Sequence, residues 1–473
     1  MQLALLGLAM AVFLHDAPEA AAWRADLAWP WVLAVVLGPK LLVGGGYAWA
    51  CRRTTARLGQ AGGARTRRRL DRLTGVLPVP LLACFVLDLW AGALVAVRGA
   101  GGVRDWVLVD EVVVMLPTLG LLAWTWSSYH PIDRRVREAT LLQRADAGLP
   151  IYPVWTRGQF VLTNVRNHAA LILAPLLVIM AWSESLVKLN ERGVIGESAA
   201  LWLMPVGVVV VFIAAPLLLC RVWDTVPLPP GELRGRLTAM CERYHVRVRD
   251  LRLWRTYGGM INAAVMGLFG RVRFILLSDG LLDQVNEREV EAVMAHELGH
   301  VRLRHLWWLL AAAAAGVAGL SVVGEGVAFV LGGWTNGAWR TGVEVGLLVA
   351  GIGLWAAGFG WVSRRIERQA DTFAARYLAN SVPRYGGPDP ADPERFTQAA
   401  AAGMIGALQR VADLNHIAPD RRSWRHGSIA WRQAYLRSLV GVPLLDPPID
   451  RLMRRINAAS VAVLIAAVTL SFV

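Results

Sequence analysis

Long apolar stretches alternate with short polar ones along most of the chain, and this pattern predicts membrane-spanning helices. A helix of about 20 apolar residues is long enough to cross a bilayer. Two apolar runs, at residues 3–14 and 458–473, are shorter, and their length does not decide whether they span the membrane. The longer stretches lie at residues 27–50, 73–97, 106–126, 169–187, 199–220, 306–331 and 341–362.

The segment 224–305 follows a different pattern, in which charges return and the apolar runs are short. Residues 232–244 have the spacing of an amphipathic helix. Three β-type runs at 246–254, 260–266 and 272–277 are separated by glycine-rich turns and predict a small sheet. A further helix is expected to begin at Asn286, which is a favourable N-cap residue.

These patterns predict a mainly α, polytopic membrane protein with about seven to nine transmembrane helices and a small α+β domain with a short β-sheet. The expected division is a membrane region at 1–223, a polar domain at 224–305, two spans in 306–363, a second part of the polar domain at 364–457, and an apolar segment at 458–473.

Composition agrees with a membrane protein, because hydrophobic residues make up 55% of the chain. The net charge of +14 comes from arginine-rich loops, and we expect the loops at 52–72 and 129–168 to face the cytoplasm. Because the positive charge is explained by these loops, we do not expect nucleic acid as a partner. Counting spans from these loops places residues 228–305 and the segment after 362 on the same, cytoplasmic side. The four cysteines are scattered and predict no disulfide framework.

Three acidic residues fall within or at the edge of apolar stretches. A carboxylate in a membrane is costly, so Asp88, Asp110 and Glu111 are expected to face a polar cavity, to pair with a partner or to lie near the end of a span.

The sequence HELGH at 296–300 is the strongest chemical signal in the chain. His296 and His300 lie one helical turn apart, so both imidazoles can reach one metal ion, with Glu297 beside them as a base. A hydrolytic zinc site needs a third protein ligand. The metzincin pattern would place a histidine where Leu306 stands, so that class is excluded.

A downstream glutamate is therefore expected to complete the site. Glu325 and Glu344 lie in or beside apolar runs, whereas Glu367 lies in a charged helical segment, SRRIERQAD. Asp371 follows Glu367 by one helical turn and could orient a ligand histidine. Glu367 is the preferred third ligand, and the site would hold one zinc ion.

At this point the chain resembles a known family. HELGH followed at a distance by SRRIERQAD is similar to the integral-membrane zinc metallopeptidases that include the type I CAAX prenyl endopeptidase and the bacterial quality-control protease HtpX. Asn262-Ala263, the run FILLSDGLL at 274–282 and HGSIAWR at 426–432 also match. The resemblance covers about residues 228–436.

The resemblance implies further site residues. Residues 260–265 would form a sheet edge to which substrate adds as a strand, with Asn262 and Ala263 contacting it. His426 and Arg432 would point into the site and stabilise the oxyanion. The alternative for Arg432 is an ion pair with Asp371. His305 is not expected to be a ligand.

The function expected from these residues is a membrane-embedded zinc endopeptidase. It would be a multi-pass protein of the cell's inner membrane that cleaves membrane-associated or misfolded polypeptides at the cytoplasmic face, with prenylated substrates left open. One alternative is a zinc transporter or other metal-binding membrane protein, but the charges on 287–304 are too many for a span. The other is a catalytically inactive scaffold.

Overall fold

The computed structural model describes residues 29–57, 75, 77–99, 106–331, 338–380 and 394–470. The chain forms two compact units, Met1–Asp224 and Thr225–Val473. The expected runs at 3–14 and around the arginines of 65–69 lie outside the described residues. The finer five-part division stays a prediction.

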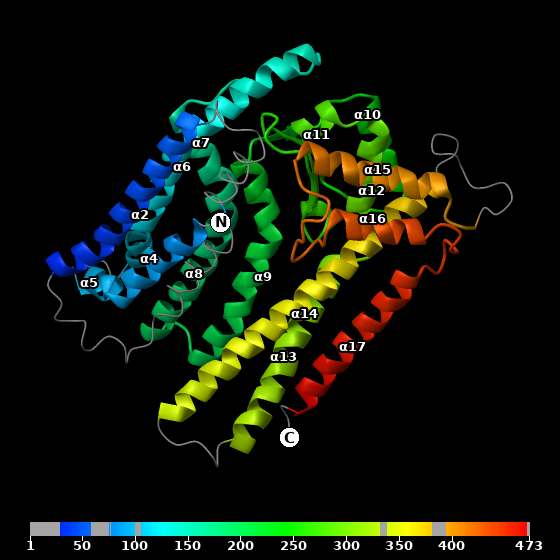
Figure 1. The fold of residues 1–473 in the computed structure, drawn as a ribbon. Helices are drawn as coiled ribbons and strands as arrows, with labels where there is room; N and C mark the ends of the chain where they lie inside the picture. The colour runs from blue at the N-terminus through cyan, green and yellow to red at the C-terminus, as the bar shows by residue number, and fades with distance from the viewer. Residues whose placement is uncertain are drawn as a thin grey trace. The chain divides into compact units, whose positions relative to one another are not determined.

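The first unit is helical (Figure 1). Phe85, Leu94, Met115 and Leu121 lie in its buried core. The expected span at 73–97 is two helices bent by 49°. The expected loop at 129–168 is largely helical, which corrects the sequence reading. The elements are α2 (Trp29–Arg57), α4 (Pro78–Trp90), α5 (Ala93–Gly99), α6 (Val109–Asp146), α7 (Arg157–Asn164), η4 (Val165–Ala169), α8 (Ala170–Glu191) and α9 (Glu197–Val222).

The acidic residues of the apolar stretches have partners, as the cost of a bare carboxylate in the membrane requires. Lys40 on α2 lies 2.5 Å from Asp88 on α4, and both side chains are buried. Arg98 lies 2.5 Å from Asp110 and 3.4 Å from Glu111. These pairs tie α2 to α4 and α5 to α6.

The second unit combines a four-stranded sheet with helices (Figure 1). Its strands are β1 (Thr225–Pro227), β2 (Asp250–Trp254), β3 (Ala263–Met266) and β4 (Phe274–Ser278), in the order β1-β2-β4-β3. The three expected β-runs are confirmed, and β1 is a strand that the sequence pattern did not reveal. β4 is fully buried, whereas β3 is an edge strand that pairs only with β4 among the described residues.

Helix α12 (Glu287–Arg302) carries HELGH beside β3. Its start is confirmed, because the Asn286 side chain accepts a hydrogen bond from the Glu289 backbone at 2.9 Å. Val290, Met294 and Leu298 recur every four residues and are fully buried, so this face of the helix packs into the core.

Figure 1 shows α13, α14 and α17 side by side, below the other helices of the unit. The predicted helices after HELGH are confirmed, and α14 continues well beyond the expected span. Helix α15 begins at Gln398, after the Thr397 N-cap. The remaining elements are α10 (Glu232–Arg243), η5 (Gly270–Val272), α11 (Asp279–Gln284), α13 (His305–Leu331), α14 (Ala338–Ala379), α15 (Gln398–Leu414), α16 (Ile429–Ser438) and α17 (Pro448–Leu470).

Six helices among the described residues are long and apolar enough to cross a membrane, or up to seven if the bent pair α4–α5 is one span. The protein is thus a mainly helical, polytopic membrane protein with a small sheet, as the sequence predicts. The described part of the apolar run that the pattern left undecided, residues 458–470, belongs to one of these helices, α17.

Candidate metal centre

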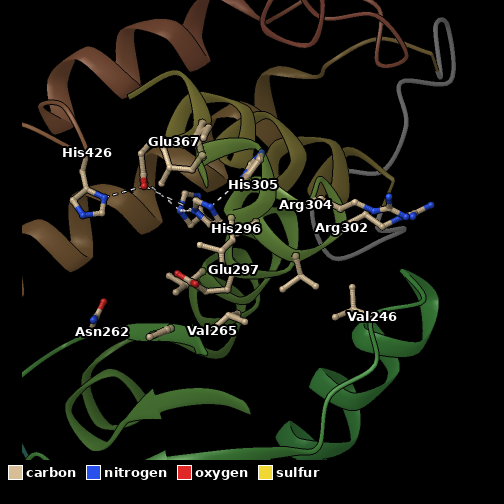
Figure 2. Close-up of a pocket in the computed structure, with 18 of the residues that line it drawn as sticks. Val246, Asn262, Val265, His296, Glu297, Arg302, Arg304, His305, Glu367 and His426 are labelled. Atoms are coloured by element: carbon tan, nitrogen blue, oxygen red, sulfur yellow. Dashed lines mark hydrogen bonds and ion pairs between the residues drawn. The ribbon is translucent and has the colours of Figure 1, made fainter. Parts of the chain in front are cut away.

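Two long helices bring the expected ligands together from positions about 70 residues apart. Nitrogen atoms of His296 and His300 on α12 and a carboxylate oxygen of Glu367 on α14 all lie within 4.8 Å of one another. α12 and α14 approach closely because residue 299 is glycine: a Cβ there would lie 3.2 Å from Phe373. Figure 2 shows the side chains of His296 and Glu367 pointing toward one another.

The Nε2 atoms of the two histidines face the same point. They lie 3.2 Å apart, and Glu367 lies 3.6 Å from His296 Nε2 and 3.9 Å from His300 Nε2. Two imidazole nitrogens and one carboxylate are the protein ligands of a large class of hydrolytic zinc sites, which keep a further position open. The donor set and its spacing fit zinc.

The carboxylate of Asp371 lies behind His296. Its Oδ1 is 2.9 Å from His296 Nδ1, and Asp371 is fully buried. A carboxylate in this place favours the proton on Nδ1 and leaves Nε2 free to bind a metal ion. This is the orienting contact expected from the spacing of Glu367 and Asp371 on one helix face.

A chain of polar contacts that the sequence analysis did not predict lies behind His300, and it is called the relay below. His305 Nδ1 is 3.0 Å from His300 Nδ1, and His305 Nε2 is 3.0 Å from Gln369 Oε1. Since an amide oxygen only accepts, His305 carries its proton on Nε2, and its Nδ1 accepts from His300 Nδ1. His300 Nε2 is then free. Gln369 in turn donates to Asp450 on α17 at 2.8 Å.

A weak signal for this relay is the position of His305 shortly after HELGH. Residue 305 lies five positions after His300, which on a continuous helix would turn it away. The helix is not continuous there, because Arg304 has a φ of 56° and α13 begins anew at His305. The change of direction returns the imidazole to the site, where His305 is only 3% exposed.

Because the relay orients His300, His305→Ala is expected to lower metal affinity by about 10- to 100-fold. Competition with a coloured zinc chelator measures this directly. Gln369→Ala should shift affinity in the same direction by less. His416→Asn is the matched control, because it replaces an imidazole outside the site at a left-handed φ of 57° that asparagine tolerates. Unchanged affinity in His305→Ala would contradict the relay.

Arg432 on α16 neutralises the carboxylates of the site. It donates to Asp371 from Nε at 2.7 Å and from Nη2 at 2.5 Å, and its Nη1 lies 3.2 Å from Glu367. The alternative raised from the sequence, an Arg432–Asp371 pair, is present. Burial alone would raise the pKa of both acids, but the charge of Arg432 outweighs it and holds the pKa of Asp371 low and that of Glu367 well below its usual range.

His426 approaches the site from the opposite side. Its Nδ1 lies 2.9 Å from Glu367 Oε1, while 57% of its side chain is exposed. The loop that carries it is fixed to α14, because Arg364 donates to the Trp424 carbonyl at 2.7 Å and Trp424 donates to the Ala356 carbonyl at 3.0 Å. Helix α16 follows directly, and the Ser428 side chain caps it by accepting a hydrogen bond from the Trp431 backbone.

Glu297, the acid of the HELGH motif, takes part in none of the ion pairs among the described residues. Burial raises its pKa to about 7, although the charge of His296 and a hydrogen bond from the Val265 backbone act in the opposite direction. It lies between α12 and β3, in a cavity of about 830 Å³ that also holds Asn262, Ala263 and the metal-facing groups. Glu325, the rejected third ligand, is exposed on α13, and the side chain of Glu344 lies outside the described residues.

Comparison with known proteins agrees with this geometry. Residues 246–386 match peptidase family M48. The chain is 30% identical over 204 residues to a protease HtpX homolog of Aeropyrum pernix, covering 42% of this chain and 58% of that protein. It is 27% identical over 216 residues to a CAAX prenyl protease 1 homolog of Arabidopsis thaliana, covering 44% of this chain and 48% of that protein.

The fold and site thus define a membrane protein with a metallopeptidase domain. The match of residues 246–386 to peptidase family M48, together with the HtpX and CAAX prenyl protease relatives, confirms the resemblance seen in the sequence. The chain spans about half the length of the curated relatives that it matches. The crystal structure of S. mikatae Ste24p aligns with a TM-score of 0.46 at 15% identity, over 87% of this chain and 99% of that chain.

Proposed function

We propose that this protein is a membrane-embedded zinc endopeptidase that cleaves membrane-associated or misfolded polypeptides at the cytoplasmic face. The observation that carries the proposal is the convergence of two Nε2 atoms and one carboxylate beside Glu297, an acid that forms no ion pair among the described residues. His296, His300 and Glu367 would hold one zinc ion, each fixed by a polar contact behind it. When bound, zinc supplies a Lewis acid that polarises the scissile carbonyl and activates water.

In this proposal the protein's own groups position the peptide and move the proton. An extended peptide adds to the free edge of β3, where Asn262 and Ala263 line the cavity and main-chain hydrogen bonds hold it with little sequence demand. Glu297 takes a proton from the attacking water and delivers it to the leaving amine. His426, which is exposed to the cavity, donates to the developing oxyanion.

The cytoplasmic orientation rests on charge. Arginines concentrate in the segments 52–72 and 129–168, and such segments remain in the cytoplasm. The competing transporter function is disfavoured because α12 lies in a domain with a sheet and carries several charged side chains. The scaffold alternative is disfavoured because the ligands, the base and their supporting contacts are all present.

The proposal is tested with the full chain purified in a neutral detergent. It should cleave an unstructured protein such as casein, lose activity to a zinc chelator and regain it with added zinc. Mass spectrometry of membranes from cells with and without the active protein would then identify natural substrates. Cleavage that survives complete removal of metal would contradict the proposal.

The two residues expected to stabilise the oxyanion should behave differently when truncated. His426→Ala should lower kcat by about 10²- to 10³-fold with metal content unchanged, as for other lost oxyanion donors. Arg432→Ala leaves two buried carboxylates without their cation and should destabilise the protein by about 3–5 kcal/mol. Thermal melting and metal analysis of both variants distinguish the two roles. A stable Arg432→Ala protein with full zinc content would contradict the positioning role of Arg432.

A further inference from the structure

One end of the cavity is rich in arginine. Figure 2 shows Asn262 and His426 at one end, Arg302, Arg304 and Val246 at the other, and Glu297 and Val265 between them. Among the residues that line it, the only carboxylates are Glu297 and Glu367, which belong to the metal centre. The end past Val265 therefore carries positive charge that no acid of the cavity wall balances.

Three arginines form this basic end: Arg273, Arg302 and Arg304. Arg273 donates to the carbonyls of Gly267 and Leu268, just after β3, and to that of Arg247. Its guanidinium is thus fixed by neutral groups alone. Arg302 and Arg304 are exposed, and the described part of the chain provides neither with an ion pair.

The basic end lies where one flank of a bound peptide would pass. Arg302 follows Glu297 by five residues on α12, which is about 8 Å along the helix axis. A strand that ran alongside α12 would advance about 3.3 Å per residue, so this distance would correspond to about two or three residues from the scissile bond. Antiparallel pairing is the more stable mode of strand addition, and it places the amino-terminal flank of the peptide past the Met266 end of β3.

We infer that the arginines Arg273, Arg302 and Arg304 form a subsite for acidic side chains, located about three residues to the amino side of the cleaved bond. The inference rests on the proposed peptidase function and specifies its substrates: segments with Asp or Glu before the cleavage site are preferred. Arginine suits this role because its planar fork binds carboxylates in a bidentate manner.

The test uses the full chain in neutral detergent and three peptides that carry Glu, Gln or Lys at one position and are otherwise identical. This position lies three residues before the cleavage site, which is first mapped with the Gln peptide. The Glu peptide should exceed the Gln peptide in kcat/KM by about five- to tenfold at low ionic strength, and the Lys peptide should fall below it. The preference should shrink in 0.5 M salt as charges are screened, to about twofold or less. Equal rates for all three peptides would overturn the inference.

Two variants assign any preference to the basic end. Arg302→Gln/Arg304→Gln should lose most of it, and Arg302→Glu/Arg304→Glu should favour the Lys peptide. Arg288→Gln, on the same helix but outside the cavity wall, should keep the preference for Glu. A preference that persists in both double variants would overturn the inference. The inference would also be overturned if the double variants differed from wild type only when the protein is placed in vesicles of anionic lipid. The arginines would then contact lipid headgroups and not the substrate.

Failure of the subsite is distinguishable from failure of the proposed peptidase function. Glu297→Gln lacks the base but retains the cavity, so equilibrium binding of the same peptides to it reports the charge preference without turnover. Tighter binding of the Glu peptide supports the subsite whether or not the wild-type chain cleaves it. Cleavage of the Gln peptide without any charge preference would refute the subsite alone.

Discussion

Glu297→Gln is expected to bind one zinc ion per chain and to lose turnover by about 10²- to 10⁴-fold in kcat. The substitution keeps the helix, the ligands and the shape of the side chain, and removes only the group that accepts the proton. Metal analysis and peptide cleavage of the same preparation measure the two effects.

The matched control for the base is Glu289→Gln, which neutralises another acid of α12 outside the cavity wall. It should cleave at close to the wild-type rate. Cleavage by Glu297→Gln at the wild-type rate would exclude the proposed mechanism, and loss of zinc from that variant would point to Glu297 as a ligand.

Glu367→Ala is expected to lose about 100-fold or more in zinc affinity, because the carboxylate that faces both Nε2 atoms is removed. After mild chelation this variant should retain little metal, whereas wild type retains one ion per chain. Arg432 keeps Asp371 as its partner, so the metal-free variant should still fold. Circular dichroism establishes folding before metal content is compared.

Glu325→Ala is the matched control, since it removes the same side chain from α13, where residue 325 is exposed. It should hold zinc as wild type does. The reverse result, with metal lost from Glu325→Ala and kept in Glu367→Ala, would move the third ligand to residue 325.

The local sequence determined the parts of the site that depend on helical geometry. The spacing of His296 and His300 places both imidazoles on one helix face wherever that helix packs. The Asn286 and Ser428 caps form because each side chain bonds a backbone group three residues on, within the same segment. Glu367 and Asp371 share a face for the same reason, and both meet Arg432.

Hydrophobic patterning also predicted the membrane helices, but not where they end. α6 continues to Asp146 through a polar segment that reads as a loop, and a bend divides the span expected at 73–97. Helix ends depend on packing and on the polar partners that the neighbouring helices provide, such as Lys40 for Asp88. Apolar length alone carries no information about those partners.

What only the tertiary structure decided is which distant groups meet. The break in helical direction at Arg304 returns His305 to His300, and α17 brings Asp450 to Gln369, 81 residues away in sequence. Arg432 is placed on Asp371 rather than free in the cavity. Such contacts join segments whose relative positions are set by packing of the whole core, whereas the sequence fixes directly only interactions within a turn or two of one helix.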